Sequence, residues 1–251
     1  CRNVTCAGSK PIALTDCLNF GNPDQTNVAY QLQNCVSGMS EASKVFNAPF
    51  VSGNVSLYNE TQGKSIYPTP VIGALGILDD VSFQISSEFK TSGDLVVLLG
   101  DSQVQGKSDS LAGSEYLELV HGLVAGNPSI DLELEQSVQK TCLRVISENI
   151  LQSAHDCSEG GLAITLAECC IMGNIGFIGT FTTYGKWDHA LFGETQSRIV
   201  VSLKPEKQVD LERICREENI PWATLGNVGG NSLKIAERIN LNLTEIRSAW
   251  N

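Results

Sequence analysis

The pattern of apolar and polar positions at the start of the chain predicts a strand, a loop and a long helix. The apolar run at residues 11–14 is typical of a buried strand, and the polar, glycine-containing residues 16–23 predict a loop. From about residue 24 to residue 46, apolar residues recur every three or four positions, which indicates a helix with one buried face. The positions on this face are Val28, Leu32, Cys35, Val36, Met39, Ala42 and Phe46.

Further extended segments follow the helix, and a change of pattern then divides the chain. Residues 49–51 are apolar, residues 52–60 are polar and predict a loop, and residues 70–78 are rich in aliphatic side chains. The polar, glycine-containing stretch near residue 90 precedes another apolar run. We therefore predict a subdomain boundary there.

The second part of the chain is predicted to mix helices with strands. Helices are expected at about 114–124, 133–152, 161–172 and 206–219, strands at 94–100, 175–181, 197–203, 222–228 and 232–236, and a short final helix ending at Trp250. Such a mixture predicts an α/β or α+β fold.

Composition excludes several classes of protein. The chain has 251 residues, of which 42% are hydrophobic and 18% are charged, as in ordinary globular proteins. Its apolar runs, such as residues 95–99, are far shorter than the ~20 residues that a membrane helix needs. A net charge of −11 disfavours a broad nucleic-acid surface. Nine cysteines without a CxxC pair are typical of reduced thiols, so we expect a cytoplasmic protein without nucleic-acid or membrane partners.

Residues 15–23 place a carboxylate, amides and a glycine between the first predicted strand and helix. Loops at the carboxyl ends of strands bind ligands in many α/β proteins. The alternative is a tight turn at Asn19 and Gly21, followed by a helix cap at Asn22 or Asp24. The pattern favours neither interpretation.

Residues 53–60 form a second group of polar side chains. Gly53 allows the backbone to approach a ligand, and Asn54 and Ser56 share a face if the segment is extended. An amide oxygen beside a hydroxyl suits a hard cation or a phosphate. The alternative is a polar turn, which the pattern alone favours slightly.

Two further groups lie in the second part of the chain. Residues 155–161 open a predicted helix with two glycines, and a helix N-terminus can bind an anion, although a simple N-cap at Ser158 is the favoured alternative. Glu194 is a candidate ligand or base, and Arg198 a candidate partner for a carboxylate or phosphate. The alternative for these two residues is a surface ion pair.

Six segments, taken in this order, closely resemble one family, phosphoribosylformylglycinamidine synthase, in its large ATP-dependent subunit (subunit II). They are ALTDCLNFGNP (13–23), GNVSLYNE (53–60), YPTPVIGALGIL (67–78), LAGSEYLEL (111–119), SAHDCSEGGLAITLAE (153–168) and LFGETQSRIVVS (191–202). The resemblance covers nearly the whole chain and implies that these residues correspond to roughly the last third of such a subunit.

The resemblance implies an aminoimidazole-ribonucleotide-synthetase-like fold of the α/β (α+β) class. A full subunit of this family resembles two tandem copies of one unit, each with an N-terminal and a C-terminal subdomain. Residues 1–90 are then an incomplete N-terminal subdomain of the second copy, and residues 91–251 are its complete C-terminal subdomain. We expect the incomplete subdomain to expose sheet edges and apolar surface, which favours association.

The activity that the resemblance implies is an ATP-dependent carbon–nitrogen ligase of purine biosynthesis, with ATP and Mg²⁺ as cofactors. ATP would phosphorylate the amide oxygen of formylglycinamide ribonucleotide, and glutamine-derived ammonia would displace phosphate to give formylglycinamidine ribonucleotide. Such chemistry depends on positioning and charge neutralisation. We expect the isolated chain to be inactive.

Four residues match positions of known role in this family. Asp16 and Gly53 match contacts to ATP, Asn54 matches a magnesium ligand, and Ser56 matches a contact to the ribonucleotide substrate. The catalytic histidine of the family belongs to the first copy, so no catalytic residue is assigned in this chain and His155 does not inherit that role. By pseudo-symmetry, residues 194–196 and 156–161 would line a second, non-catalytic site, which holds a structural nucleotide in some long members of the family.

The resemblance also implies partners. They are the substrate formylglycinamide ribonucleotide, the upstream half of the same subunit and, if the subunit is of the short type, separate glutaminase and small accessory subunits. The alternative function is a non-catalytic nucleotide-binding or assembly module of the same subunit.

Overall fold

The computed structural model describes residues 1–107 and 109–250, which form two compact units. Unit 1 comprises Cys1 and Ser9–Ile77. Unit 2 comprises Arg2–Gly8 and the chain from Leu78 onward. The short helix α1 (Arg2–Cys6) therefore belongs to unit 2, although it precedes the first strand of unit 1. This division differs from the boundary expected near residue 90.

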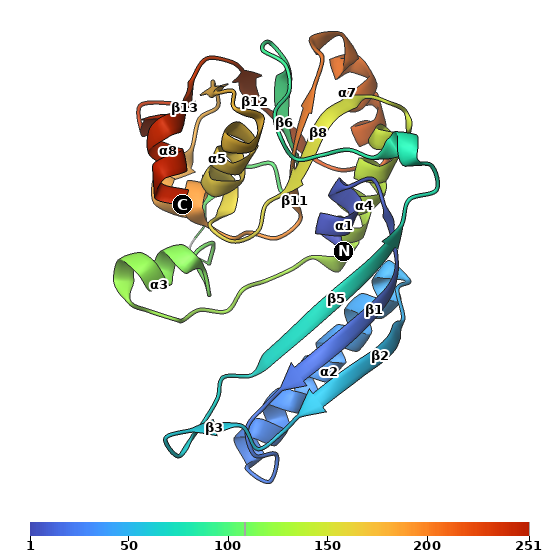
Figure 1. Ribbon diagram of the computed structural model, residues 1–251, viewed down its shortest axis with the longest axis vertical. Helices are drawn as coiled ribbons and strands as arrows, with labels where there is room; N and C mark the ends of the chain where they lie inside the picture. Colours follow the sequence, from blue (N-terminus) through green and yellow to red (C-terminus); the bar gives the residue numbers. More distant parts are fainter. Residues whose placement is uncertain (108, 251) are drawn as a thin grey trace. The chain divides into compact units, whose positions relative to one another are not determined.

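Unit 1 is a three-stranded sheet with one long helix against it. Its strand order is β2 (Phe50–Ser56), β1 (Lys10–Asn19) and β5 (Thr69–Ile77), with β1 parallel to β2 and antiparallel to β5. The helix α2 (Thr26–Phe46) packs on the sheet through a small core around Leu18, Phe20 and Val28 (Figure 1). A short hairpin, β3 (Glu60–Thr61) with β4 (Lys64–Ser65), follows β2.

Two segments of unit 1 that were predicted as loops are largely strands. The prediction of a loop over residues 16–23 was wrong for residues 16–19, since β1 continues to Asn19. The loop predicted over residues 52–60 was wrong for residues 52–56, since β2 continues to Ser56. The reason is backbone pairing, which stabilises an extended chain whatever the polarity of its side chains: β1 is paired on both sides, and residues 52–56 of the edge strand β2 pair with residues 15–19 of β1.

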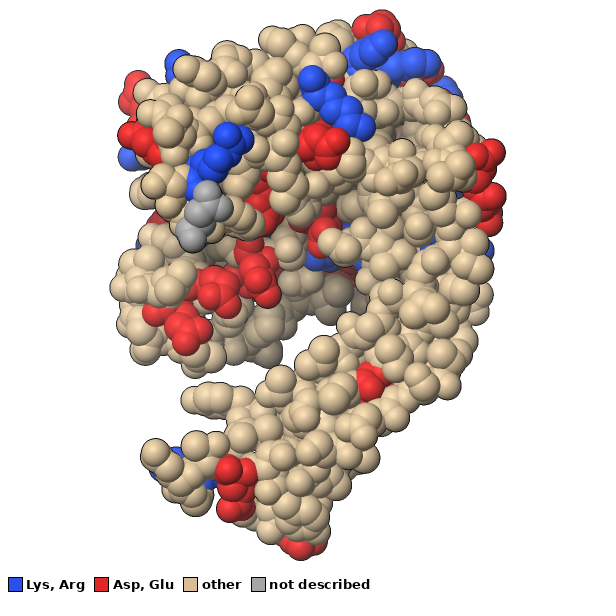
Figure 2. Space-filling model, in the orientation of Figure 1, with Lys and Arg blue, Asp and Glu red and all other residues tan. Residues whose placement is uncertain are grey.

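The predicted apolar face of the helix exists, but it is incompletely covered. Val28 is buried, Leu32 and Met39 are partly buried against the core, and Val36 is 45% exposed. Apolar side chains on the sheet are exposed as well, including Val51. Figure 2 shows few charged side chains on the visible surface of this unit. Exposed apolar surface of this kind favours association with another protein surface.

Unit 2 contains a seven-stranded sheet (Figure 1). The strand order is β14 (Ile239–Asn242), β13 (Ser232–Ile235), β9 (Phe177–Gly179), β12 (Trp222–Val228), β6 (Leu95–Gly100), β11 (Arg198–Leu203) and β8 (Leu151–Asp156). Neighbouring strands are antiparallel except β9 and β13. The predicted fold class, a mixture of helices and strands, is confirmed.

Helices cover both faces of this sheet. Besides α1, the helices of this unit are α3 (Glu115–His121), α4 (Leu132–Ser147), α5 (Gly161–Gly173), α6 (Trp187–Phe192), α7 (Gln208–Glu217) and α8 (Leu243–Trp250). Two 3₁₀ turns (Val81–Phe83 and Pro205–Lys207) and a parallel pair of short strands, β7 (Gln105–Gly106) and β10 (Tyr184–Gly185), complete the unit. No helix in the described residues is long and apolar enough to span a bilayer.

The strand β6 shows why the sheet needs both helical layers. Val96 and Leu98 belong to the core that includes α5, whereas Val97 and Leu99 belong to the core that includes α4 and α7. Successive side chains of a strand point to opposite faces, so a strand buried on both faces is apolar throughout. This explains the uninterrupted apolar run in the sequence.

The helix predicted over residues 133–152 was too long. α4 ends at Ser147, Asn149 adopts a left-handed conformation (φ 53°), and the chain enters the strand β8 at Leu151. Ile150 and Leu151 continue the apolar spacing of the helix, which made the two elements look like one. Pairing with β11 at the sheet edge decides the conformation instead. The helices α1 and α6 and the strand β14 were also missed.

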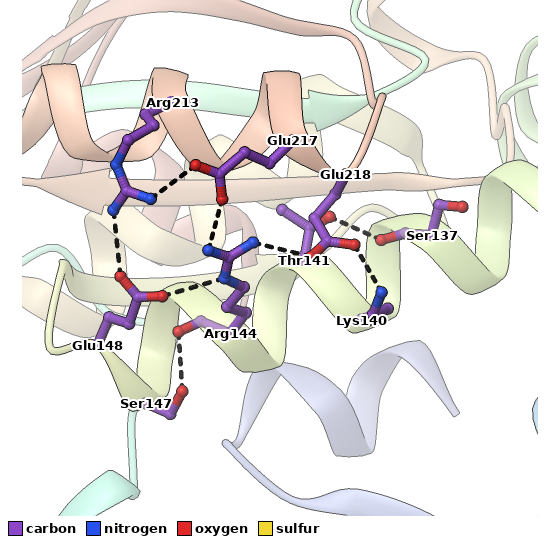
Figure 3. A network of polar contacts seen from close by, with 9 residues as sticks. All are labelled: Ser137, Lys140, Thr141, Arg144, Ser147, Glu148, Arg213, Glu217 and Glu218. Carbon is purple, nitrogen blue, oxygen red and sulfur yellow. Dashed lines mark hydrogen bonds and ion pairs between the residues drawn. The ribbon is translucent and has the colours of Figure 1, made fainter.

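The helices α4 and α7 are joined by a network of ion pairs (Figure 3). Arg144 of α4 pairs with Glu148, Glu217 and Glu218 at 3.0, 2.6 and 2.9 Å. Arg213 of α7 pairs with Glu217 at 3.0 Å and with Glu148 at 3.4 Å. Because most of these groups are accessible to solvent, each pair adds little to the stability of the fold, although the network links the two helices at several points.

Candidate functional site

The four residues that the sequence identifies as a candidate site lie on the neighbouring strands β1 and β2. The strands are paired in parallel with Asp16 opposite Gly53, Cys17 opposite Asn54, and Asn19 opposite Ser56. The backbone N–H of Phe20 donates to the carbonyl of Ser56 at 3.0 Å, which extends the pairing just beyond β1. The backbone of the sheet therefore determines the spacing of these side chains.

The carboxylate of Asp16 lies directly over Gly53. A Cβ atom on Gly53 would be 2.5 Å from Asp16 Oδ2 and 2.6 Å from Oδ1, so a side chain at this position would displace the carboxylate of Asp16. Glycine at position 53 therefore allows the carboxylate of Asp16 to keep this position. An acidic side chain and a bare backbone segment lie together on this face of the sheet.

Asn54 and Ser56 lie on the other face of the sheet. The amide nitrogen of Asn54 is 3.9 Å from the Sγ of Cys17, the residue after Asp16, and adjacent residues of a strand point to opposite faces. The structure therefore brings Asp16 together with Gly53, and Asn54 together with Ser56, but it does not gather all four residues on one face. The expectation that Asn54 and Ser56 share a face is met.

Sequence reasoning missed a residue that contacts Ser56. Asn59 donates from its amide nitrogen to the carbonyls of Phe20 and Ser56, both at 3.0 Å, and its Oδ1 lies 3.2 Å from the hydroxyl of Ser56. The sequence had included Asn59 only as part of a polar segment. Its role depends on a contact with the end of β1, which nothing in the local pattern indicates.

The surroundings of Asn54 are compatible with one protein ligand to a magnesium ion. Among the described residues, no group of three or more His, Cys, Asp or Glu side chains is arranged to hold a metal. Asn54 is exposed, and its contact to Cys17 involves the amide nitrogen. The contact therefore does not use the side-chain oxygen of Asn54. Mg²⁺ in proteins commonly takes one or two protein oxygens together with waters and phosphate oxygens, so one amide ligand is compatible with such a site.

A second site of interest lies within unit 2, where a cavity of about 450 Å³ follows the segment 194–197. Polar residues on its wall include Asp101, Asp131, Gln196 and Ser197. Ser197 adopts a left-handed conformation (φ 59°), and its buried hydroxyl has no hydrogen-bond partner in the described residues. The hydroxyl of Ser197 is buried away from solvent, so the case for a candidate binding site rests on the size of the cavity and the polar residues of its wall.

Glu194 and Arg198 do not form the surface ion pair of the alternative interpretation, because each bonds to backbone groups instead. One oxygen of Glu194 accepts from the backbone N–H groups of Gly160 and Glu115, both at 2.9 Å. Arg198 is buried and donates to the carbonyls of Gly193 and Thr195 at 2.6 and 3.2 Å. Both side chains organise the backbone around the cavity.

The predicted helix caps were wrong in detail. The N-cap residue of α5 is Gly160, in a left-handed conformation, rather than Ser158. The N-cap residue of α2 is Gln25, while Asn22 closes a local turn by accepting from the backbone N–H of Asp24 at 2.8 Å. At the start of α5 the anion near the backbone N–H groups is the protein's own Glu194 carboxylate.

His155 forms a buried charge cluster, with no sign of catalytic geometry. Its Nε2 is 2.9 Å from Glu168 Oε2 and its Nδ1 is 3.6 Å from Asp156 Oδ1. Burial by itself lowers the pKa of His155, but the hydrogen bonds and charges of Asp156 and Glu168 outweigh burial and raise the pKa to about 9. His155 is therefore protonated at neutral pH and ties β8 to α5.

This cluster predicts a pH-dependent stability. The pKa of His155 is about 9 in the folded protein and about 6.5 in the unfolded chain, so its stabilisation is complete below about pH 6.5 and is lost as pH rises through 9. We expect the free energy of unfolding of the wild type, relative to His155→Gln, to fall on the order of 2 kcal/mol between pH 6.5 and 9.5. Urea unfolding at both pH values measures it.

The comparison with His155→Gln cancels the titration of the buried cysteines, which both proteins share. A difference in unfolding free energy that stays constant over this pH range would show that the fold does not raise the pKa of His155.

Comparisons with known proteins agree with this fold. The family model for the N-terminal domain of AIR synthase related proteins matches residues 1–78, and the model for the C-terminal domain matches residues 91–236. The chain belongs to the AIR synthase related family.

Similar curated proteins include several that are named phosphoribosylformylglycinamidine synthase subunit PurL. The PurL proteins of Anaeromyxobacter sp. (strain Fw109-5) and Thermomicrobium roseum are 44% and 46% identical to this chain over 99% of its length. The chain covers 33% and 34% of these proteins, so it spans about a third of their length. The resemblance identified from the six segments is confirmed.

Solved structures show the same fold. The structure described as T. maritima PurL complexed with FGAR matches with a TM-score of 0.74 and 17% identity, over 98% of this chain and 41% of the other. The hydrogenase maturation protein HypE of E. coli matches with a TM-score of 0.69 and 15% identity, over 96% and 76% of the two chains. At such low identity these matches establish the fold alone.

Proposed function

We propose that this chain forms part of an ATP-dependent phosphoribosylformylglycinamidine synthase subunit in purine biosynthesis. The observation that carries the proposal is the pairing of Asp16 with Gly53 and the shared face of Asn54 and Ser56 on two adjacent strands. These are the residues that match the nucleotide, metal and substrate contacts of the family, and the chain resembles PurL proteins along 99% of its length.

In the proposed reaction, the amide oxygen of formylglycinamide ribonucleotide attacks the γ-phosphorus of ATP and ADP leaves. The nitrogen of ammonia then attacks the activated carbon, and phosphate leaves to give formylglycinamidine ribonucleotide. Asp16 and Gly53 hold ATP, Asn54 is a ligand of Mg²⁺, and Ser56 binds the ribonucleotide. Bound Mg²⁺ would supply positive charge at the phosphates, which the acidic chain does not provide.

The proposal includes the place of this chain in a larger, cytoplasmic subunit. Residues 1–90 are proposed to be the incomplete N-terminal subdomain of a second tandem copy, and residues 91–251 its C-terminal subdomain. The exposed apolar side chains of unit 1 support a partner surface, for which we propose the upstream half of the subunit. Separate glutaminase and accessory subunits would supply ammonia in a short-type enzyme.

Complementation tests the proposal. We expect no release of ADP from the isolated chain with ATP, ammonium and formylglycinamide ribonucleotide, and restored release when the chain is co-expressed with the upstream segment of its parent subunit. The physical reason is that the chain carries only part of a composite site. Turnover by the isolated chain, or none in the combined protein, would contradict this assignment.

A second candidate function is a non-catalytic nucleotide-binding or assembly module. The observation that favours it is the cavity beside Gln196, whose wall is lined by polar side chains. In this alternative the residues of β1 and β2 would not affect turnover. The variants of Asp16 and Asn54 described in the Discussion separate the two functions.

A further inference from the structure

We propose that Asn59 is a positioning residue that orients the hydroxyl of Ser56, so that Ser56 accepts a hydrogen bond from a hydroxyl or N–H group of the substrate. The inference rests on the proposed function, in which Ser56 contacts the ribonucleotide. It goes further in assigning a role to Asn59 and in stating which chemical groups of the substrate Ser56 can recognise.

The surroundings of Asn59 determine the orientation of its side-chain amide. One terminal atom lies 3.0 Å from the carbonyl oxygens of both Phe20 and Ser56. Carbonyl oxygens only accept hydrogen bonds, so the atom that faces them must be the NH₂ group. The other terminal atom is then the carbonyl oxygen Oδ1, which can only accept.

This orientation determines the direction of the hydroxyl of Ser56. Oδ1 of Asn59 is 3.2 Å from Ser56 Oγ, so the hydroxyl donates its single proton to it. The nitrogen of Asn59 is also 3.1 Å from Ser56 Oγ, so its two hydrogens are shared among this oxygen and the two carbonyl oxygens. This contact uses one lone pair of Ser56 Oγ and leaves the other for a ligand. The proton of Ser56 is therefore committed inside the protein.

A hydroxyl whose proton is committed offers a ligand only its lone pairs. Ser56 is partly exposed at the end of β2, so its oxygen can accept from a ligand. Phosphate and carboxylate oxygens at neutral pH are mainly acceptors and are poor partners for such an oxygen. The group that Ser56 recognises is therefore a hydroxyl or an N–H, as found on the ribose and on the formylglycinamide portion of the proposed substrate.

Backbone contacts keep this arrangement in place independently of the side chain of Asn59. The backbone N–H of Asn59 donates to the carbonyl of Phe20 at 3.1 Å, and the N–H of Tyr58 donates to the carbonyl of Gly21 at 3.0 Å. Substitution of Asn59 is therefore expected to release the hydroxyl of Ser56 while the segment stays attached to the end of β1.

The test measures KM and kcat for formylglycinamide ribonucleotide in the full-length subunit that contains this chain, with saturating ATP and ammonium. We expect Ser56→Ala to raise KM about 10-fold with kcat within about threefold, since one hydrogen bond to a neutral group is lost. Asn59→Ala should raise KM by a similar factor. The double variant should raise KM no further than either single one, because the two residues act as a unit.

Asn59→Asp separates positioning from a general structural role. A carboxylate still accepts the proton of Ser56 but no longer donates to the carbonyls of Phe20 and Ser56. Both Asn59 variants should therefore lower the unfolding temperature, but only Asn59→Ala should raise KM. If Asn59→Ala does not fold, a KM for Asn59→Asp within about threefold of wild type supports the proposal, and a rise equal to that of Ser56→Ala overturns it.

The outcomes distinguish this inference from the proposed function. If Ser56→Ala leaves KM unchanged, the assignment of Ser56 to the substrate site fails. If Ser56→Ala raises KM but the effect of Asn59→Ala is absent or additive, only the role of Asn59 fails. The control is Asn34→Ala, which removes an exposed hydrogen bond to the carbonyl of Tyr30 on α2 and should leave KM unchanged.

Discussion

Replacing Asn54 by alanine in the full-length subunit is expected to reduce ammonia-dependent turnover about 100- to 1,000-fold, the loss that follows removal of one group stabilising transition-state charge. Asn54 is exposed, and its contact with Cys17 is a weak one at 3.9 Å. Its removal should therefore leave the fold unchanged, and a loss of turnover would reflect the chemistry of the site. ADP release at saturating formylglycinamide ribonucleotide and ammonium measures it, with circular dichroism as the test of folding.

Asp16→Ala is the companion variant on the other face of the sheet. We expect it to raise the KM for ATP as well as to slow turnover, because Asp16 is proposed to contact the nucleotide. Asn34→Ala, an exposed asparagine on α2, is the matched control and should behave as wild type. Unchanged turnover in both Asp16→Ala and Asn54→Ala would remove the catalytic assignment and favour the nucleotide-binding or assembly module.

The second large effect, on the free energy of unfolding, is expected at the buried ion pair that attaches α1 to the rest of unit 2. Arg2 and Glu135 are 2.8 Å apart, and their side chains are 12% and 3% exposed. Glu135 also accepts from the amide of Gln139 at 2.9 Å. Glu135→Ala removes the carboxylate partner of this buried guanidinium, which keeps its hydrogen bond to the carbonyl of Cys157 at 3.0 Å. We therefore expect a loss of about 3 kcal/mol in the free energy of unfolding, at the lower end of the range for a broken buried ion pair, measured by urea denaturation.

The chain contains a matched control for this prediction. Arg216 and Glu212 are also 2.8 Å apart, and Glu212 also accepts from a glutamine four residues away, Gln208. Their side chains are 61% and 27% exposed, so Glu212→Ala should cost less than about 1 kcal/mol. Equal losses in the two variants would show that burial does not govern the strength of these pairs.

Local sequence patterns correctly predicted the helices and strands whose buried side chains recur at the regular spacing of that element. The long helix of unit 1, predicted from residue 24 to residue 46, is α2, and the apolar run at residues 94–100 is β6. The same patterns failed for residues 16–19 and 52–56, because these strands of a three-stranded sheet carry polar side chains and lack a regular alternation of apolar residues. They failed again at residue 151, where a strand continues the spacing of a helix.

The candidate site shows the same division. Asp16, Gly53, Asn54 and Ser56 were selected by their resemblance to a family, and their spacing along two strands follows from the sequence. Their partition between two faces depends on the register of β1 against β2. Asn59 could not be recognised because its partners at Phe20 and Ser56 meet only when the ends of the strands lie together.

By itself, the sequence determined the fold class, the family and the identity of the candidate residues, because these depend on apolar periodicity and on motifs that are contiguous along the chain. The tertiary structure alone decided that α1 joins unit 2, that Glu194 and Arg198 bond to the backbone, and that His155 is held between two carboxylates. The physical reason is that hydrogen bonds, ion pairs and pKa values depend on distances between residues far apart in sequence, which only the packed chain determines.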